Sequence, residues 1–277
     1  MVTTFAEAPR QAVKTAPSKP VLTVAPPQEE RKVAVITGAG RGLGKAVAFA
    51  LANEGYALAL CDRTGQGKKV ADDLMKMDYV AVYEHVDVVF YKRLASFLQD
   101  TEKRWGRIDV LVNNAGFVHE KKSVETISHA DFDPCFETNA IAPMTAIQAV
   151  LPGMVRRESG CIINVASKAA RYASPGFAAY NMSKAALVSL TQTVAKELKG
   201  TGVRIYSVSP GGMNTEMRDK AHGDAKEQMD PADVAFHIAR LAKGERIGGK
   251  AYWIPDGADV IVSKKGIEVH PMEEWYE

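Results

Sequence analysis

Short apolar stretches alternate with longer amphipathic stretches from Lys32 onward. Short apolar runs predict buried strands, and apolar positions that recur every three or four residues predict helices. The expected strands are KVAVIT (32–37), ALALC (57–61), AVYEHV (81–86), IDVLVNNAG (108–116), CIINVAS (161–167), GVRIYSVSPGG (202–212) and GKAYWIPDG (249–257). Helical spacing is clearest in GKAVAFALANEG (44–55) and in the stretch that begins at Tyr180.

Uniformly apolar strands separated by helices imply an α/β fold, in which helices cover both faces of a parallel sheet. Right-handed crossovers then give a single-domain, Rossmann-like, doubly wound sheet of about seven strands, with a ligand cleft at the C-terminal ends of the strands. No internal linker interrupts residues 31–262, so we expect one domain there, followed by a C-terminal tail over residues 263–277.

The first 30 residues differ in composition from the rest. They contain five prolines, many alanines and a single aromatic residue, so we expect residues 1–30 to be a flexible extension that does not fold alone. The apolar core of a secretory signal is missing. An organelle transit peptide is the alternative, because basic residues are scattered through the segment, although Glu7 counts against it.

Composition narrows the possible functions. Apolar residues make up 46% and charged residues 25% of the chain, which is ordinary for a globular protein. A net charge of +2 does not suggest a nucleic-acid partner, and no apolar run reaches the roughly 18 residues of a membrane helix. The three cysteines are widely spaced and form no CxxC pair, which argues against disulfides and a metal site and favours the cytoplasm, a reducing compartment.

The segment TGAGRGLG (37–44) connects the first expected strand to the first expected helix. Gly38, Gly42 and Gly44 permit a tight turn and a close approach of the backbone, and the N-terminus of the helix attracts a pyrophosphate. A glycine cluster alone is weak evidence, because any turn between a strand and a helix can need one. Asp62 strengthens the case for a nucleotide site, since it ends the second strand, where an acid meets a ribose.

Tyr180 and Lys184 lie four residues apart at the start of a long helix, so they share one face. Such a pair also arises by chance on the surface of an amphipathic helix. Its position favours chemistry, because Ser167 ends the preceding strand and Asn139 lies where an earlier long helix begins.

With these motifs the sequence resembles the short-chain dehydrogenase/reductase family in its one-domain form. The resemblance covers nearly everything from Val33 to Gly257. It rests on motifs in the family's order, which are TGAGRGLG, HVDV (85–88), NNAG (113–116), Asn139, Ser167, YNMSK (180–184), SPGGMNT (209–215) and PDG (255–257). It implies that residues 31–262 form a dinucleotide-binding catalytic domain, in which a hydride passes between a nicotinamide cofactor and a secondary alcohol or ketone.

The resemblance also implies a catalytic tetrad of Asn139, Ser167, Tyr180 and Lys184. Tyr180 would be the acid/base, Ser167 would stabilise the substrate oxygen, and Asn139 would position a water that relays protons to Lys184. Lys184 would also hydrogen-bond the nicotinamide ribose. The alternatives are a helix cap for Asn139 and a strand-end hydroxyl for Ser167. A cation about 4 Å from a phenol contributes on the order of 4 kcal/mol toward lowering its pKa of about 10, less the cost of desolvation.

The same resemblance assigns the remaining cofactor contacts. Asp87 would meet the adenine edge, and Thr215 would lie near the carboxamide of the nicotinamide. Asn113 is assigned either a direct contact or support of the central strand. The expected cofactor residues are Gly38, Arg41, Gly42, Leu43, Gly44, Asp62, Arg63, Asp87, Val88, Asn113, Asn114, Ala115, Gly116, Pro210, Gly211, Met213 and Thr215, together with Tyr180 and Lys184.

Asp62 and Arg63 indicate different cofactors. A carboxylate at the end of the second strand accepts both ribose hydroxyls and repels a 2′-phosphate, which favours NAD. Arg63 and Arg41 favour NADP, because arginine binds phosphate through paired donors and the family's NADP-dependent members often carry a basic residue at these places. We expect NAD rather than NADP, since the carboxylate excludes the phosphate directly.

Three segments would border a small alcohol or carbonyl substrate, namely residues 117–123, 168–179 and 213–228. The expected lining residues are Ser167, Lys168, Phe117, Phe177 and Met213. His119 could contact the substrate, but we expect it to be a solvated loop histidine.

The leading hypothesis is an NAD-dependent alcohol dehydrogenase or ketone reductase. One alternative is an NADPH-dependent 3-oxoacyl-thioester reductase. Another, in a different class, is a catalytically silent nucleotide-binding regulator or scaffold, against which the complete tetrad argues. The stretches 144–157 and 184–198 are apolar on more than one face, and the resemblance suggests that they form a homodimer or homotetramer.

Overall fold

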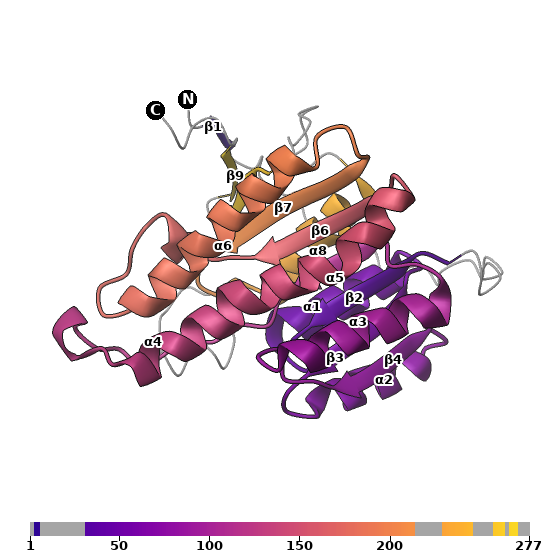
Figure 1. Cartoon of the computed structure of the whole chain (residues 1–277), viewed down its shortest axis with the longest axis horizontal. Helices are drawn as coiled ribbons and strands as arrows, with labels where there is room; N and C mark the ends of the chain where they lie inside the picture. Colours follow the sequence, from indigo (N-terminus) through magenta and orange to yellow (C-terminus); the bar gives the residue numbers. More distant parts are fainter. Residues whose placement is uncertain (1–2, 6–30, 214–228, 246–256, 264–265, 271–277) are drawn as a thin grey trace, which may run out of the picture.

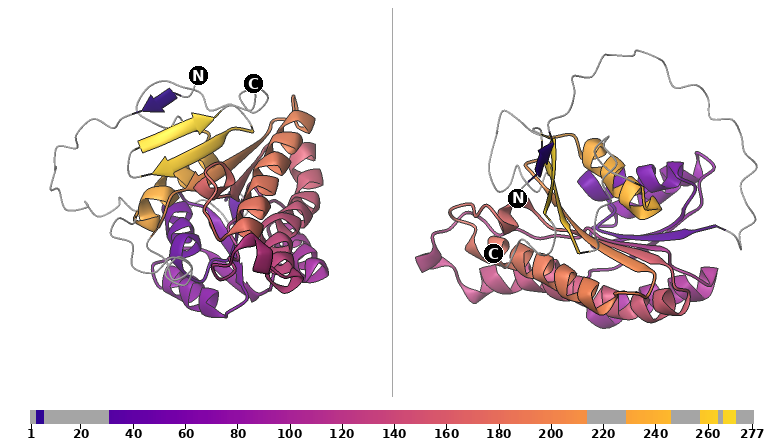
Figure 2. Two further views of the ribbon diagram at one scale, coloured as in Figure 1. Left: turned by 90° about the vertical axis from the view of Figure 1, so that its left-hand side faces the viewer. Right: turned by 90° about the horizontal axis from the view of Figure 1, so that it is seen from above.

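A computed structural model of the chain describes residues 3–5, 31–213, 229–245, 257–263 and 266–270. These residues form one nine-stranded sheet with helices on both faces (Figures 1 and 2). The strands are β1 (Thr3–Phe5), β2 (Val33–Thr37), β3 (Ala57–Asp62), β4 (Ala81–His85), β5 (Val110–Asn113), β6 (Gly160–Val165), β7 (Val203–Pro210), β8 (Asp259–Ser263) and β9 (Gly266–His270). The helices are α1 (Gly42–Asn53), α2 (Gln66–Met75), α3 (Tyr91–Trp105), α4 (His129–Phe136), α5 (Ala142–Arg156), α6 (Ala178–Glu197) and α8 (Pro231–Lys243), with short turns η2 (Val124–Thr126), η3 (Glu137–Ile141) and η4 (Lys168–Ala170).

The strand order confirms the predicted doubly wound sheet. It runs β1-β9-β8-β7-β6-β5-β2-β3-β4, and every pair from β8 to β4 is parallel. The parallel part of the sheet starts at β2, runs outward to β4 and then returns to β5 on the other side of β2. The strand order therefore reverses between β2 and β5, and the C-terminal ends of strands at such a reversal are where α/β sheets bind ligands.

Alternate residues of each strand supply the two cores. Ala34 and Ile36 of β2 pack with α1, α2 and α8, whereas Val33 and Val35 pack with α3, α5 and α6. Because both faces of the sheet are covered, β2 is buried along its whole length, which explains its uninterrupted apolar sequence. No helix in the described ranges is long and apolar enough to cross a membrane.

Two strands lie outside the boundaries that the sequence analysis drew. Strand β9 falls in the segment expected to be a C-terminal tail, and it pairs antiparallel with β8. Strand β1 falls in the expected flexible extension and pairs antiparallel with β9. Both strands are short, and β9 alternates apolar and polar residues as antiparallel strands often do, so neither produces the long apolar run on which the prediction relied. Most of the strand predicted over 249–257 lies outside the described residues.

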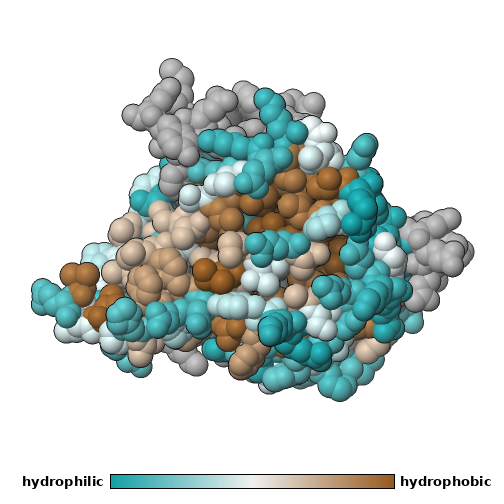
Figure 3. Space-filling view, in the orientation of Figure 1, coloured by the Kyte–Doolittle hydropathy of each residue, from teal (hydrophilic) through white to brown (hydrophobic). Residues whose placement is uncertain are grey.

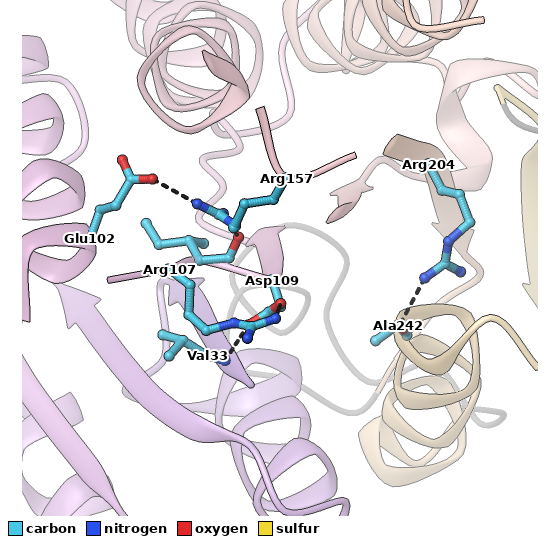
Figure 4. A network of polar contacts seen from close by, with 8 residues as sticks. Val33, Glu102, Arg107, Asp109, Arg157, Arg204 and Ala242 are labelled. Carbon is cyan, nitrogen blue, oxygen red and sulfur yellow. Dashed lines mark hydrogen bonds and ion pairs between the residues drawn. The ribbon is translucent and has the colours of Figure 1, made fainter. Parts of the chain in front are cut away.

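Charged side chains hold the N-terminal ends of the strands together (Figure 4). Asp109 precedes β5, accepts the backbone N–H of Val33 and pairs with Arg107 at 2.6 Å. Arg157 pairs with Glu102 and donates to a backbone carbonyl. Further along the same edge, Arg204 donates to backbone carbonyls at the end of α8 (Figure 4). These contacts provide hydrogen-bond partners for backbone groups at the ends of strands and helices. They lie at the N-terminal ends of the strands, away from the C-terminal ends where a ligand is expected.

Candidate active site

The turn between β2 and α1 is built from glycines that tolerate no side chain. Gly38 has a φ of 65°, and a Cβ atom there would lie 2.8 Å from the Cα of Ala115. A Cβ atom on Gly44 would lie 2.2 Å from the carbonyl oxygen of Gly38. Asn114 donates from its amide to the carbonyls of Thr37 and Gly38, at 2.9 and 3.0 Å, and so fixes the turn against β5. The N-cap residue Arg41 makes no side-chain capping hydrogen bond to the first N–H groups of α1 within the described part of the chain, which suits these groups to bind an anion.

A cleft of about 460 Å³ opens at the C-terminal ends of β2, β3, β5 and β6. Its walls contain the glycine turn, the end of β3, the segment after β4, the segment after β5 and the first part of α6. The lining residues are Gly38, Gly40, Arg41, Gly42, Leu43, Gly44, Asp62, Arg63, Thr64, Val86, Asp87, Val88, Asn114, Ala115, Gly116, Thr138, Val165, Ala166, Tyr180, Lys184 and Met213. A cleft at the C-terminal ends of the strands, with a glycine turn in its wall, suits a dinucleotide.

Asp62 is one of two acidic residues that line this cleft, the other being Asp87, and it is only 6% exposed. Its Oδ1 accepts the N–H groups of Thr64 and Gly65, both at 2.7 Å, and the hydroxyl of Thr64 at 3.1 Å. Its Oδ2 accepts the N–H of Gly67 and lies against Gly40, where a Cβ atom would be 2.4 Å away. The carboxylate therefore organises the start of α2 and presents Oδ2 to the glycine turn.

Tyr180 and Lys184 occupy one face of α6 at the inner end of the cleft. The Nζ of Lys184 donates to the carbonyl of Val165 at 2.8 Å and lies 6.0 Å from the centre of the Tyr180 ring. Ser167 follows β6, and its hydroxyl hydrogen-bonds the Tyr180 hydroxyl. The same Oγ accepts the N–H of Ala169 at 3.1 Å, which starts η4. The end of β6 thus contacts both side chains of the pair.

Asn139 lies in a π-helical turn, Glu137–Ile141, immediately before α5. Its side chain accepts the N–H of Phe117 and donates to the carbonyl of Phe117, both at 2.8 Å, and it also donates to the hydroxyl of Ser183 at 2.9 Å. The fully buried amide therefore joins the loop after β5 to α6. π-Helical turns inside α-helices are frequent at functional sites, because they change the backbone hydrogen bonding locally.

Burial dominates the proton equilibria of the Tyr180–Lys184 pair in the ligand-free chain. Desolvation raises the pKa of Tyr180, and the hydrogen bond from Ser167 opposes this rise. Desolvation also lowers the pKa of Lys184 to about 8. Desolvation therefore outweighs the expected lowering of the tyrosine pKa by Lys184 in this state. A bound oxidised nicotinamide would add a positive charge, which acts in the opposite direction on the tyrosine.

The structure brings most of the expected cofactor residues to the cleft, but three of them line no part of it. Asn113 is buried and donates to the side chain of Asn164 at 2.9 Å, so it supports the central strands. Pro210 and Gly211 continue β7 beside β8, and within the described part of that segment, which ends at residue 213, only Met213 lines the cleft. Thr215 lies outside the described residues.

The substrate side of the site differs from expectation at two buried residues. His119 is 4% exposed, so the expectation of a solvated histidine was wrong. Its Nδ1 lies 2.6 Å from the carbonyl of Glu120, and its ring centre lies 5.9 Å from that of Phe177. Phe177 is itself buried, because the loops 117–123 and 168–179 pack against each other. Lys168 and Phe117 are half-buried, and Lys168 lies over the ring of Tyr172.

Several cleft residues were missed by the sequence analysis. They are Gly40, Thr64, Val86, Thr138, Val165 and Ala166. The sequence could have predicted Gly40, since it is a further glycine of the TGAGRGLG turn. In the structure it lies beside Asp62. The others flank predicted residues at strand and helix ends, where the backbone forms the wall and the type of side chain carries little information.

Comparison with known proteins identifies the family of the chain. The sequence profile of the short chain dehydrogenase family matches residues 32–226. An uncharacterised oxidoreductase of Staphylococcus saprophyticus is 34% identical over 74% of this chain and 88% of its own length. The 3-oxoacyl-[acyl-carrier-protein] reductase of Thermotoga maritima is 34% identical over 78% of this chain and 92% of its own length.

Two solved structures have the same fold. An alcohol dehydrogenase from the archaeon Thermococcus sibiricus, complexed with 5-hydroxy-NADP, superimposes with a TM-score of 0.71 and 32% identity, over 77% of this chain and 91% of its own. A metagenomic short-chain oxidoreductase in complex with NADP gives a TM-score of 0.68 and 30% identity, over 78% and 92%. The chain belongs to the short-chain dehydrogenase/reductase family. It is an oxidoreductase that uses a nicotinamide cofactor and acts on small molecules.

Proposed function

We propose that the chain transfers a hydride between a nicotinamide cofactor and a secondary alcohol or ketone, with Tyr180 as the acid/base. The observation that carries this proposal is that Tyr180 and Lys184 line the cleft that starts at the glycine turn. The carbonyl of Val165 holds Lys184, and Ser167 hydrogen-bonds Tyr180 from the end of β6. In this proposal the nicotinamide lies beside Tyr180, and its pyrophosphate lies at the N-terminus of α1.

The residues of the tetrad have separate tasks in this reaction. Tyr180 gives or takes the proton of the substrate oxygen, and Ser167 stabilises the charge that develops on that oxygen. Lys184 is held by the carbonyl of Val165, with its Nζ 6.0 Å from the centre of the Tyr180 ring, and in this proposal it binds the nicotinamide ribose. Asn139 keeps the loop after β5 in register with α6, so that the backbone around it can hold a water next to Lys184.

We propose NAD as the preferred cofactor. The Oδ2 of Asp62 faces Gly40 and the glycine turn, where the adenosine ribose binds in this arrangement. A carboxylate at that position accepts ribose hydroxyls and repels a 2′-phosphate. NADP is the alternative, because Arg41 and Arg63 line the same part of the cleft and both solved relatives contain NADP or its hydroxylated form.

A second candidate activity is the NADPH-dependent reduction of a 3-oxoacyl thioester. Its support is the 34% identity with the Thermotoga maritima reductase over most of both chains. Turnover of an acetoacetyl thioester with NADPH, exceeding the turnover of simple ketones, would favour this activity over the first.

Replacement of the acid/base tests the proposed chemistry. Tyr180→Phe removes one hydroxyl and keeps the ring, so we expect the turnover of secondary alcohols to fall about 10³-fold or more. NADH affinity, measured by fluorescence titration, should change by less than about threefold, because the phenol proton contributes little to binding. Unchanged turnover in this variant would refute Tyr180 as the acid/base. Cofactor binding without any turnover by the native chain would favour the silent regulator.

We further propose a homodimer formed through α5 and α6. The face that carries these helices shows a band of hydrophobic surface (Figure 3). Met144 and Val155 on α5 and Met182 on α6 are exposed apolar side chains. A molar mass of about twice the chain mass by light scattering is expected, and Met182→Lys should shift it toward the monomer. A native monomer at micromolar concentration would contradict this proposal.

A further inference from the structure

A row of buried polar side chains crosses the sheet one level below the candidate site. Asn113 of β5 stands opposite Asn164 of β6, which stands opposite Ser207 of β7. Ser207 in turn stands opposite Asp259 of β8, and Asp259 stands opposite His270 of β9. Directly opposed residues of neighbouring strands point to the same face of the sheet, so these five side chains form one line. All of them are buried.

Asp259 is the acidic member of this row and has no exposed surface. Its Oδ1 accepts the hydroxyl of Ser207 at 2.9 Å and the hydroxyl of Ser209 at 2.7 Å. Its Oδ2 has no hydrogen-bond partner among the described residues, but the Nε of Arg171 lies 3.9 Å away. One oxygen therefore joins β7 to β8, while the other is directed at a side chain from a different part of the chain.

Arg171 belongs to the turn that starts at Ser167. The carbonyl of Ser167 accepts the N–H of Ala170 at 2.9 Å, and the carbonyl of Lys168 accepts the N–H groups of Arg171 and Tyr172 at 3.1 and 2.9 Å. These short bonds make residues 167–172 one compact turn. A force on the side chain of Arg171, which is 20% exposed, is therefore transmitted to the backbone of Ser167.

The physical chemistry of Asp259 favours such a tether. Burial raises the pKa of this carboxyl group, and its bonds with Ser209 and Ser207 and the charge of Arg171 oppose that rise. A carboxylate without exposed surface is strongly disfavoured unless opposite charge or donors compensate it. Among the described residues, Arg171 is the cation that forms an ion pair with its second oxygen, at 3.9 Å, so withdrawal of the 167–172 turn from β8 would leave the carboxylate poorly compensated.

We propose that Asp259 is a positioning residue, which holds the turn carrying Ser167 against the ends of β7 and β8 through Arg171. This inference rests on the proposed function, because Ser167 receives its catalytic role there. Asp259 itself does not line the cleft and touches no reacting atom. Its effect is geometric, since a hydroxyl that is displaced by a fraction of an ångström stabilises the substrate oxygen less well.

Two single variants and their combination test the tether in the full-length protein. Asp259→Asn keeps an acceptor for the two serines and removes the charge, whereas Arg171→Met removes the cation and keeps most of the side-chain length. In hydrogen–deuterium exchange without cofactor, we expect each variant to speed the exchange of amides 170–172 by about tenfold. In turnover assays we expect kcat to fall about tenfold, with NADH affinity changed less than about twofold. The double variant should have the same kcat and the same amide exchange as the more strongly affected single variant, because both substitutions break one interaction.

Asp109→Asn is the matched control, because Asp109 is also a buried carboxylate paired with an arginine, at the opposite edge of the sheet. It should lower thermal stability without changing kcat or the exchange of amides 170–172. Native exchange at those amides in Asp259→Asn, or additive losses in the double variant, would overturn the tether. A native chain that turns over no alcohol or ketone would instead refute the proposed function, and the exchange experiment would still decide whether the tether exists.

Discussion

A buried aspartate lies at each end of the parallel strands, and the two carboxylates have different kinds of hydrogen-bond donor. Asp109, at the N-terminal edge, is 6% exposed and pairs with Arg107 at 2.6 Å. Asp62, at the C-terminal edge, is equally buried, and the donors that it accepts are neutral amides and a hydroxyl of its own loop. The buried charge of Asp109 is thus compensated by a neighbouring positive charge, whereas that of Asp62 is compensated by neutral hydrogen-bond donors.

This difference separates a structural carboxylate from one that can act on a ligand. A neighbouring guanidinium cancels most of the field of Asp109, so its contribution is confined to holding β2 and β5 together. Amide donors stabilise the carboxylate of Asp62 but add no full positive charge, and its field extends into the cleft. Lys184 gives the cleft a similar feature of opposite sign, since its buried ammonium donates to a carbonyl.

The largest effect that we expect from this comparison is a pH-dependent stability caused by Lys184. Burial lowers its pKa from 10.5 to about 8 in the folded chain. Below pH 8 both states hold the proton, and the folded state bears the cost of the buried charge. Between pH 8 and 10.5 the unfolded state holds more protons, so the stability of the native chain rises with pH. Relative to Lys184→Met, the free energy of unfolding should rise by on the order of 3 kcal/mol over this range.

Urea unfolding of the cofactor-free protein at several pH values measures this difference. The titration of tyrosines and cysteines, which acts in the opposite direction at alkaline pH, is largely common to both proteins and cancels. Lys68→Met is the matched control, because Lys68 is exposed and its ion pair with Asp72 lies on the surface. A difference between the native chain and Lys184→Met that stays constant with pH would show that Lys184 is not desolvated.

A smaller effect is expected on the choice of cofactor. Asp62→Asn removes the charge but keeps an acceptor for the loop, so the repulsion of a 2′-phosphate should weaken. We expect the affinity for NADPH relative to NADH to rise about tenfold, which corresponds to about 1.4 kcal/mol. Paired fluorescence titrations of the native chain and the variant with NADH and NADPH measure this ratio.

Asp109→Asn is the control for Asp62→Asn. It removes a charge that is buried to the same extent, but whose field is cancelled by Arg107. It should lower the free energy of unfolding by about 2 kcal/mol and leave the NADPH-to-NADH affinity ratio unchanged. If Asp62→Asn also leaves the ratio unchanged, while Arg63→Met abolishes NADPH binding, the arginines and not the carboxylate determine the choice.

Much of the fold and of the site followed from the sequence, because the information is local. Apolar runs gave the parallel strands, and the glycines of TGAGRGLG gave the turn that only residues without a Cβ can form. The spacing of Tyr180 and Lys184 placed both on one helical face, and motif order predicted their neighbour Ser167. Each of these features depends on residues that are close in the chain or at strand ends that any doubly wound sheet brings together.

The tertiary structure alone decided which polar residues face the ligand and which support the sheet. Asn113 and Asn114 are adjacent in sequence, yet only Asn114 lines the cleft, because successive side chains of a strand point to opposite faces. The burial of His119 and the contact between Asp259 and Arg171 depend on loops and strands that are distant in the chain. Strand register and loop packing are set by the whole core, so no local pattern contains them.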